Sequence, residues 1–392
     1  MIQISNIISF IAPNKSHCKK KTKDKLIFVI EYPIFGVDRV KKMKNKKDLI
    51  KEVVFDSSLN IEEQLMLDFY DEAFPNKNDF LTNNWKWINN PDYYDFKYPN
   101  IATHEGKVVG QLNFTPYTAV LDGEKIEAGW GGDLIVLKRY RGSYIAIRLI
   151  EDYLQKPLAN FAFVNINSYN LLLKRYDWTA HENNFMHFFS LAPFKKKSIP
   201  SIIKKIGNAA AGVFLKSLYR KYAVSQSKIE VKKVDAESIK GLVDTLEDHS
   251  PNTMYPLYDI NQLTWRLLKS PYSDSYRIFS FPTLNIDVAV NLYLHRDAKQ
   301  IDLMYVPPKA SNEEIRKIIA SIAIWAIKNN YQSFRYFTSN PNCSTLLKST
   351  LKSSIGKQLC VFFSSDKALY EKMKKAAWRW QIIDSDLEKF AN

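Results

Sequence analysis

Glycines and basic residues cluster in one stretch of the chain, in a pattern that suits anion binding. Seven of the 12 glycines fall between Gly106 and Gly142. Residues 133–146 run from an apolar stretch through a basic, glycine-bearing turn into a second apolar stretch. This order predicts a strand, a turn and a helix N-terminus. The backbone N–H groups of such a turn and the helix dipole together form a site suited to a pyrophosphate.

The elements that must position this turn follow an α/β order. Apolar periodicity and turn signals predict helices over residues 60–74, 143–154 and 168–176, and strands over 107–115, 124–137, 161–166 and 184–191. Asp122 and Gly123 form a hairpin turn signal between the first two strands. The second block repeats this order, with helices predicted near 236–247, 259–268, 311–329 and 343–351 and strands at 276–281, 287–294, 300–306, 333–338 and 357–364. We therefore expect an α/β (α+β) protein built from two tandem domains of one fold, each a mixed central β-sheet flanked by helices.

The positive charge is confined to two segments. The 392 residues carry a formal charge of +15, and 46% of them are hydrophobic, which excludes a wholly disordered chain. Residues 1–48 hold 12 basic against 4 acidic residues, and residues 193–233 hold 11 against 1, so the remaining chain nets −3. These shifts predict a basic N-terminal extension (1–48), a first domain (49–192), a basic helical connector (193–233) and a second domain (234–392). The charge is thus weak evidence that the folded domains bind a polyanion.

Several partner classes find little support in the sequence. Three cysteines cannot form a disulfide framework, which favours a reducing compartment, and no apolar run is long enough to span a bilayer. We expect a cytoplasmic protein. His181 and His187 lack the Cys or carboxylate partners of a metal site, so no metal is predicted. Apolar residues at helical spacing within 201–221, with lysines between them, predict a helix packed between the domains or, alternatively, one that makes a peripheral membrane contact.

Residues 133–150 resemble the acyl-CoA-binding motif of the GNAT N-acetyltransferases. The matching positions are Val136, Tyr140, Arg141, Gly142, Ile145, Ala146, Leu149 and Ile150. Residues 163–178 resemble the Asn-bearing strand end and helix that follow in that family, and 102–110 its preceding strand pair. The resemblance covers about residues 50–192. More loosely it covers 234–392, where 258–266 and 378–386 resemble two-domain GNAT proteins of surface-polysaccharide gene clusters.

The resemblance implies direct acyl transfer from an acyl-CoA cosubstrate, acetyl-CoA in the simplest case, to an amine. It places the cosubstrate on Ile135, Val136, Leu137, Arg141, Gly142, Ser143, Tyr144, Ile145, Ala146 and Asn167. Arg139 and Arg148 are further candidates for phosphate contacts. The attacking amine must be neutral, and Asp133 and Glu127 are the candidate bases because they lie on or beside the central strand. A backbone N–H near residues 135–137 is the expected donor to the thioester oxyanion. Tyr176 is a candidate proton donor to the departing thiolate.

The chain departs from the family pattern in both blocks. Tyr144 stands where the family has its second motif glycine, and Leu173 falls near the position of the usual tyrosine acid. In the second block the corresponding turn, residues 307–311, contains no glycine, and its Pro307 and Pro308 lack N–H donors. We predict that the second block does not bind CoA and instead walls the substrate cleft.

Three functional hypotheses follow. The first is an acyl-CoA-dependent N-acyltransferase that acetylates an amino group of a sugar nucleotide or similar metabolite, in polysaccharide biosynthesis. The second is a catalytically inactive tandem GNAT fold that acts as a binding or scaffold protein, suggested by Tyr144 and by Leu173. The third is a relative that uses aminoacyl-tRNA, suggested by the two basic segments, with nucleic acid otherwise not expected as a partner.

Overall fold

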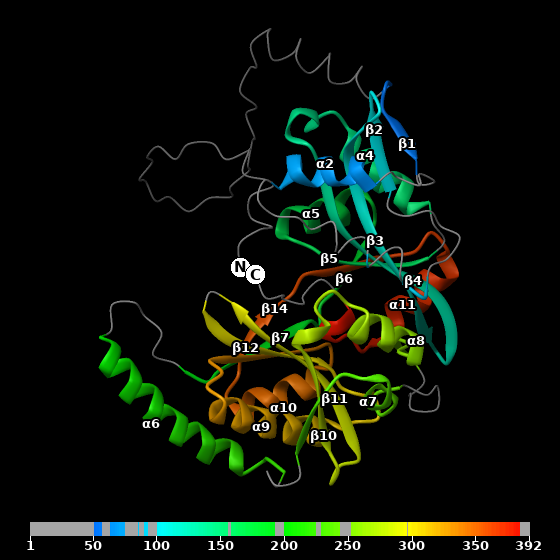
Figure 1. The fold of residues 1–392 in the computed structure, drawn as a ribbon. Helices are drawn as coiled ribbons and strands as arrows, with labels where there is room; N and C mark the ends of the chain where they lie inside the picture. The colour runs from blue at the N-terminus through cyan, green and yellow to red at the C-terminus, as the bar shows by residue number, and fades with distance from the viewer. Residues whose placement is uncertain are drawn as a thin grey trace, which may run out of the picture.

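A computed structural model describes residues 51–56, 63–74, 85, 90–92, 100–155, 158–192, 200–224, 229–243, 252–295 and 297–384. Two β-sheets, each flanked by helices, form the body of the protein (Figure 1). The predicted class, a mixed α/β fold with two similar sheet-and-helix units, is confirmed. The predicted N-terminal extension, 1–48, lies outside the described residues.

The first half of the chain supplies most of the first sheet and the helices that cover it. Its strands are β1 (Val54–Asp56), β2 (Asn100–His104), β3 (Lys107–Leu121), β4 (Glu124–Val136), β5 (Ala159–Phe163), β6 (Thr179–His181) and β7 (Phe185–Ser190), and its helices are α2 (Glu63–Ala73), α4 (Ile145–Leu154) and α5 (Ile166–Arg175). The predicted hairpin is present, and Asp122 and Gly123 both have positive φ, at 55° and 84°. These angles match a two-residue turn that follows the right-handed strand twist.

The second half repeats this order. Its strands are β8 (Glu230–Lys233), β9 (Thr253–Pro256), β10 (Tyr276–Phe281), β11 (Ile286–His295), β12 (Ala298–Tyr305), β13 (Ser333–Thr338), β14 (Ser354–Lys357), β15 (Cys360–Phe363) and β16 (Ala377–Trp378). Its helices are α7 (Ala236–Lys240), α8 (Ile260–Leu263) with a π-helical turn at Thr264–Leu268, α9 (Asn312–Lys328), α10 (Pro341–Leu351) and α11 (Lys367–Lys375). Helix α6 (Ser201–Arg220) joins the halves, and among the described residues no helix is both long and apolar enough to cross a bilayer.

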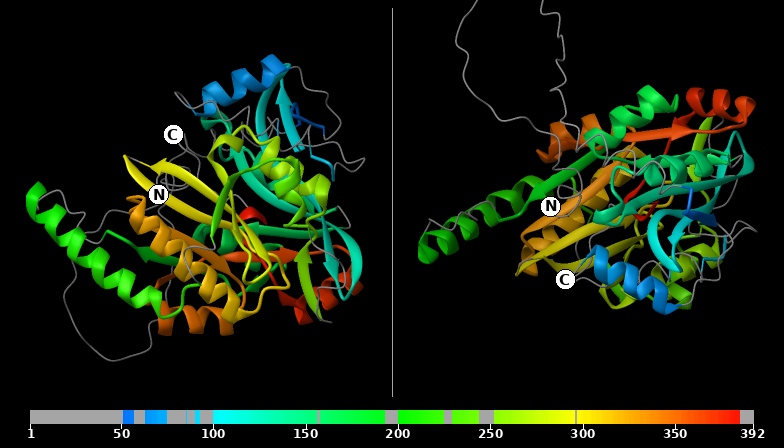
Figure 2. Two further views of the ribbon diagram at one scale, coloured as in Figure 1. Left: turned by 60° about the horizontal axis from the view of Figure 1, so that its bottom comes forward. Right: turned by 90° about the horizontal axis from the view of Figure 1, so that it is seen from above.

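Each half contributes to the sheet of the other half. Strands β9 and β16 of the second half extend the first sheet through the pairing of β9 with β3, and in addition one strand crosses in each direction. In the first sheet the order is β1-β2-β3-β4-β5-β15-β6, so β15 from the end of the chain lies between two strands of the first half. In the second sheet the order is β14-β7-β13-β12-β11-β10-β8, so β7 lies between two strands of the second half (Figure 2). The division of the chain into domains at residues 192 and 234 stays a prediction, because each sheet takes a strand from beyond it.

Two predicted boundaries are corrected by local hydrogen bonds. The strand predicted over 161–166 ends at Phe163, because the Asn165 side chain accepts a hydrogen bond from Ser168 N at 3.0 Å and caps α5, which begins at Ile166. The strand predicted over 357–364 is instead two short strands, β14 and β15, which pair in different sheets.

A shared aromatic core joins the two sheets. Trp130 of β4 and Phe161 of β5 pack against Trp380, with ring centroids 5.2 and 4.8 Å away. The same buried cluster continues into Met304 and Phe337 of the second sheet. Because this core belongs to both halves, it holds the carboxyl-terminal residues 377–384 against β3 and β4.

Candidate functional site

Strands β4 and β5 separate beyond a short ladder. They pair in parallel at Ala128–Ala159, Gly129–Asn160 and Trp130–Phe161, and within the described residues the ladder ends there. Strand β4 nevertheless continues to Val136. Against β3, the register passes from Gly132 to Ile135 on β4 while β3 advances only from Asn113 to Gln111, so β4 carries a bulge at this point. The splayed part of β4 therefore presents backbone toward a gap in the sheet.

The predicted turn follows directly and leads into α4. A 3₁₀ turn at Lys138–Tyr140 is followed by Gly142, whose φ is 85°, and by Tyr144, whose φ is 66°. A tyrosine in the left-handed backbone conformation of Tyr144 is strained by about 1–2 kcal/mol relative to the right-handed one. A glycine at this position would avoid that strain. The Tyr144 side chain is 42% exposed. The first N–H groups of α4 have no intrahelical acceptor and point out of the helix end, as an anion site requires.

Arginines around the turn differ in their surroundings. Arg141 Nε donates to the Val136 carbonyl at 3.0 Å, which fixes the guanidinium against the strand end. Arg139 pairs with Glu72 at 3.3 Å, and Arg148 pairs with Asp152 at 3.0 Å. Arg141 is thus the arginine that the turn itself positions.

Most of the predicted cosubstrate residues lie within one segment, residues 135–146, at the end of β4, the turn and the start of α4. Ile135, Val136, Leu137, Ser143 and Ile145 are buried, and Ala146 is half-buried. Ser143 Oγ donates to the Tyr140 carbonyl at 2.5 Å, and Leu137 N donates to Val109 O at 3.0 Å. The Leu137 N–H is therefore engaged with β3, so the expected oxyanion donor falls on earlier residues of β4.

The predicted acid–base residues are spread over several elements. Asp133 lies at the β4 bulge and Asn167 in the first turn of α5; their side chains are outside the described ones. Glu127 is exposed, opposite Thr118 in the β3–β4 ladder. Tyr176 is half-buried just beyond α5, and burial raises its pKa. Among the described residues that line the two cavities below, neither Glu127 nor Tyr176 occurs.

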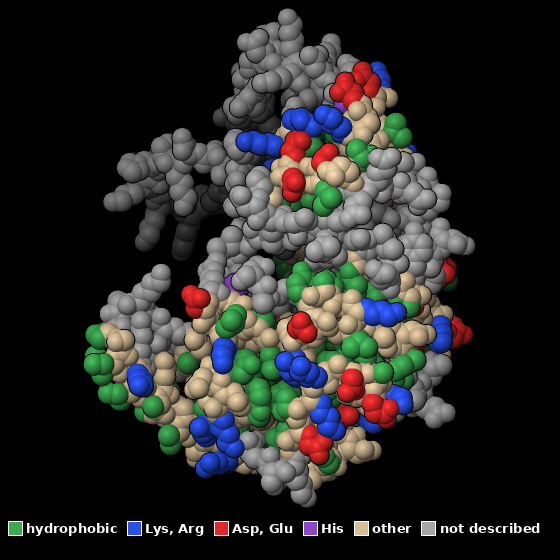
Figure 3. Space-filling view, viewed as in Figure 1, with side chains coloured by type: hydrophobic (Ala, Val, Ile, Leu, Met, Phe, Trp, Pro, Cys, Tyr) green, Lys and Arg blue, Asp and Glu red, His purple; other side chains and the backbone are tan. Residues whose placement is uncertain are grey.

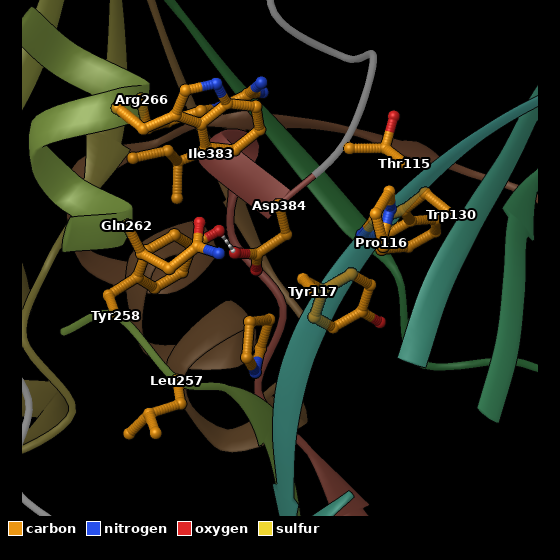
Figure 4. A pocket seen from close by; sticks show the side chains of 12 residues that line it. Thr115, Pro116, Tyr117, Trp130, Leu257, Tyr258, Gln262, Arg266, Ile383 and Asp384 are labelled. Carbon is orange, nitrogen blue, oxygen red and sulfur yellow. Dashed lines mark hydrogen bonds between the residues drawn. The ribbon is translucent and has the colours of Figure 1, made fainter. Parts of the chain in front are cut away.

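A buried carboxyl group lies where the two halves meet. Asp384 lies in a small cavity of about 30 Å³ with Tyr117, Trp130, Tyr258 and Gln262 in its wall. Figure 4 shows Asp384 between the side chains of the β3 segment and those around α8. The volume is enough for about one water molecule. Because Trp130 is the last β4 residue paired with β5, this cavity adjoins the point where the strands separate.

Burial changes the acid–base behaviour of Asp384. Tyr258 Oη donates to Asp384 Oδ1 at 2.5 Å, and Gln381 N donates to Oδ2. Desolvation raises the pKa of Asp384 from 3.8 to about 7, although these two hydrogen bonds and the charge of Arg266 oppose the rise. A carboxyl group with a pKa near 7 exchanges its proton readily at neutral pH, as a general base must.

A larger cavity of about 370 Å³ adjoins the same carboxyl group on the side of the second sheet. We call it the second-half cavity. It lies where β12 and β13 cease to pair, between Tyr305 and Thr338, and reaches the Pro307–Pro308 turn before α9. Its remaining wall includes aromatic and polar side chains: Tyr255, Tyr258, Ser311, Asn312, Tyr336, Ser339, Asn340, Arg379, Trp380, Gln381 and Asp384. It is thus the counterpart, in the second sheet, of the β4–β5 gap in the first.

Sequence reasoning missed Asp384 as a functional candidate. The signal was present in the segments 258–266 and 378–386, both of which resemble two-domain GNAT proteins. The structure joins them through the hydrogen bond between Tyr258 and Asp384, residues 126 positions apart. That separation hides the pair from any local pattern.

Comparisons with solved structures agree with this architecture. A GCN5-related N-acetyltransferase from Kribbella flavida matches with a TM-score of 0.52 at 11% identity, over 80% of this chain and 71% of that one. An Enterococcus faecalis protein of unknown function, described as a probable N-acyltransferase, matches with 0.51 at 12% identity over 80% and 71%. A GCN5-related N-acetyltransferase from Anabaena variabilis matches with 0.51 at 11% identity over 79% and 72%.

The chain therefore shares the fold of the GCN5-related N-acetyltransferase structures that it matches, as the sequence resemblance predicted. No protein-family model matches the chain, and no curated protein matches it by sequence.

Proposed function

We propose that the protein is an acyl-CoA-dependent N-acyltransferase. The observation that carries this proposal is the splayed β4–β5 pair that leads directly into a glycine-bearing turn at the N-terminus of α4. The open part of β4 can pair with the amide groups of a pantetheine arm. The turn and the first N–H groups of α4 suit the pyrophosphate, with Arg141 beside them. The relatives of this fold include two named as N-acetyltransferases, which makes acetyl-CoA the first cosubstrate to test.

The acceptor amine is assigned to the second-half cavity. Its aromatic and polar wall suits a ring compound with several hydrogen-bonding groups, such as an amino sugar or its nucleotide derivative. The two proline residues of its turn offer no N–H groups, so a pyrophosphate cradle like that of the first half is absent from this turn. A role in polysaccharide biosynthesis fits such an acceptor.

Asp384 is the proposed base. An incoming ammonium group loses a proton to the Asp384 carboxylate, directly or through the water-sized cavity beside Trp130. The neutral nitrogen then forms a bond to the thioester carbonyl carbon, and backbone N–H groups of β4 stabilise the oxyanion. Collapse breaks the carbon–sulfur bond. The nitrogen gives up its second proton and the departing CoA thiolate takes up one proton, so the products are a neutral amide and CoA with a free thiol.

An activity assay tests this proposal. The full-length protein is incubated with acetyl-CoA and a panel of amino sugars, nucleotide amino sugars and amino acids, and free thiol and acylated product are both measured. Acetyl-CoA-dependent product with at least one amine is the expected result. Thiol release at the uncatalysed rate with every amine, together with acetyl-CoA binding, would favour the scaffold hypothesis instead.

A further inference from the structure

Helix α6 is attached to the body of the protein along only part of its length. Its C-terminal half packs against α9 through Gly212 and Tyr219, both buried, and the Cβ position of Gly212 lies 3.5 Å from Ile327. Toward its N-terminus the helix extends away from the two sheets (Figures 1 and 2). Every described side chain from Ser201 to Ile206 is exposed.

Large apolar side chains lie on the face of α6 that is turned away from α9. Ile202, Ile203, Ile206, Val213 and Phe214 are each between 55% and 71% exposed. At about 3.6 residues per turn these five share one face, and Gly212 and Tyr219 occupy the face turned to α9. In Figure 3, hydrophobic side chains gather along the outer edge of this helix, with Lys or Arg side chains beside them. The helix expected to pack between domains therefore has an apolar face that no described residue covers.

The charge of this region restricts what can cover that face. Helix α6 contains three lysines and one arginine and no acidic residue. The surrounding segment, residues 193–233, nets +10. A second copy of α6 would bring two such segments together, and residues 1–48 carry a charge of +8 themselves. Both occupants that the chain itself could supply are thus opposed by like charges.

We propose that α6 docks the protein on an anionic lipid surface. An apolar stripe flanked by basic residues is the arrangement of helices that lie in the membrane interface, where apolar side chains enter the acyl boundary and Lys and Arg contact acidic headgroups. The helix lies parallel to the surface, since its opposite face is held on α9. Docking of this kind holds the body of the protein at the membrane surface.

Vesicle flotation with the full chain tests this inference. Vesicles of phosphatidylcholine with phosphatidylglycerol are compared with vesicles of phosphatidylcholine alone. The apolar variant carries Ile206→Ser, Val213→Ser and Phe214→Ser, and the charge variant carries Lys205→Glu and Lys221→Glu. Leu294→Ser is the matched control, because Leu294 on β11 is also 52% exposed but lies away from α6.

We expect the wild type and the Leu294→Ser control to float with anionic vesicles and not with neutral ones. Loss of the three apolar side chains that enter the lipid in this proposal should weaken binding more than about tenfold, and the charge variant should lose the preference for anionic lipid. Unchanged flotation of the apolar variant would overturn the proposal, since residues 1–48 would then suffice. A wild type that does not float would also overturn it, as would a dimer that the apolar variant converts to a monomer in sedimentation.

Discussion

Replacing Asp384 by Asn separates a catalytic role of this residue from a structural one. Asn keeps the size of the side chain and one carbonyl oxygen to accept from Tyr258 or Gln381, but it cannot take a proton at neutral pH. If Asp384 is the base, kcat falls by about 10²–10⁴. The rise of the wild-type rate with pH, centred near pH 7, should disappear in the variant.

The same Asp384→Asn variant, although slower, is expected to be more stable than the wild type above pH 7. The pKa of Asp384 is about 7 in the folded protein against 3.8 ordinarily, so the folded state binds the extra proton between these values. The contribution of Asp384 to the free energy of unfolding is therefore fully present below pH 4 and is lost as the pH rises from 4 to 7. At pH 8 the ionised carboxylate costs about 4 kcal/mol. Asn removes that cost but leaves one hydrogen bond unmade, at about 1–3 kcal/mol.

Urea unfolding at pH 6 and pH 8, beside steady-state kinetics, measures both effects. The expected variant at pH 8 is slow but about 1–3 kcal/mol more stable than the wild type. Asp133→Asn and Glu127→Gln serve as comparisons and should retain the pH dependence. A stable Asp384→Asn enzyme with wild-type kcat would refute the assignment. So would loss of the pH dependence in Asp133→Asn alone, which would identify the β4 carboxylate as the base.

Four further substitutions test the packing and titration of the scaffold by urea unfolding. Gly129→Ala places a Cβ 1.8 Å from the Phe114 ring and should lower the free energy of unfolding by about 3 kcal/mol. Gly131→Ala places a Cβ 3.2 Å from Tyr153 and should lower it by less than about 1 kcal/mol. Equal losses in the two variants would contradict the packing. Asp302→Asn leaves the buried Arg335 without its carboxylate and should cost about 3–5 kcal/mol, so a loss below about 1 kcal/mol would show the pair to be dispensable. Burial lowers the pKa of His187 to about 4, so the unfolded chain binds more protons than the folded chain between pH 4 and 6.5. The free energy of unfolding should therefore fall by about 2 kcal/mol from pH 7 to pH 5. His187→Gln should reduce this pH dependence, and an unchanged pH dependence would contradict the assignment.

Local pattern was sufficient for the elements that build the proposed cosubstrate site. The hairpin at Asp122 and Gly123, the turn at Gly142 and the apolar stripe of α4 each arise from residues within a few positions of one another. Their chemistry also depends on backbone groups, which any residue supplies. The sequence therefore predicted the strand–turn–helix from the residues alone, and its binding of a pyrophosphate stays a proposal.

Long-range pairing lay beyond such patterns. Strands β7 and β15 have the same alternation whichever sheet they join, so their exchange is visible only in the folded chain. The burial of Asp384 could not be predicted from local pattern either, because it comes from packing against β3, β4 and α8 rather than from neighbours in sequence. For α6, periodicity identified the helix, but the choice between its two apolar faces depends on α9.

Isothermal titration of the full-length protein with acetyl-CoA tests the central claim most directly. The wild type should bind, and Gly142→Trp should abolish binding because an indole ring would occupy the turn before α4. Gly123→Trp is the matched control, since its backbone φ of 84° is nearly that of Gly142 but it lies at the far end of β4. Binding retained by the control and lost by Gly142→Trp is the predicted result. No binding by the wild type at millimolar acetyl-CoA, or equal affinity in all three proteins, would contradict the account.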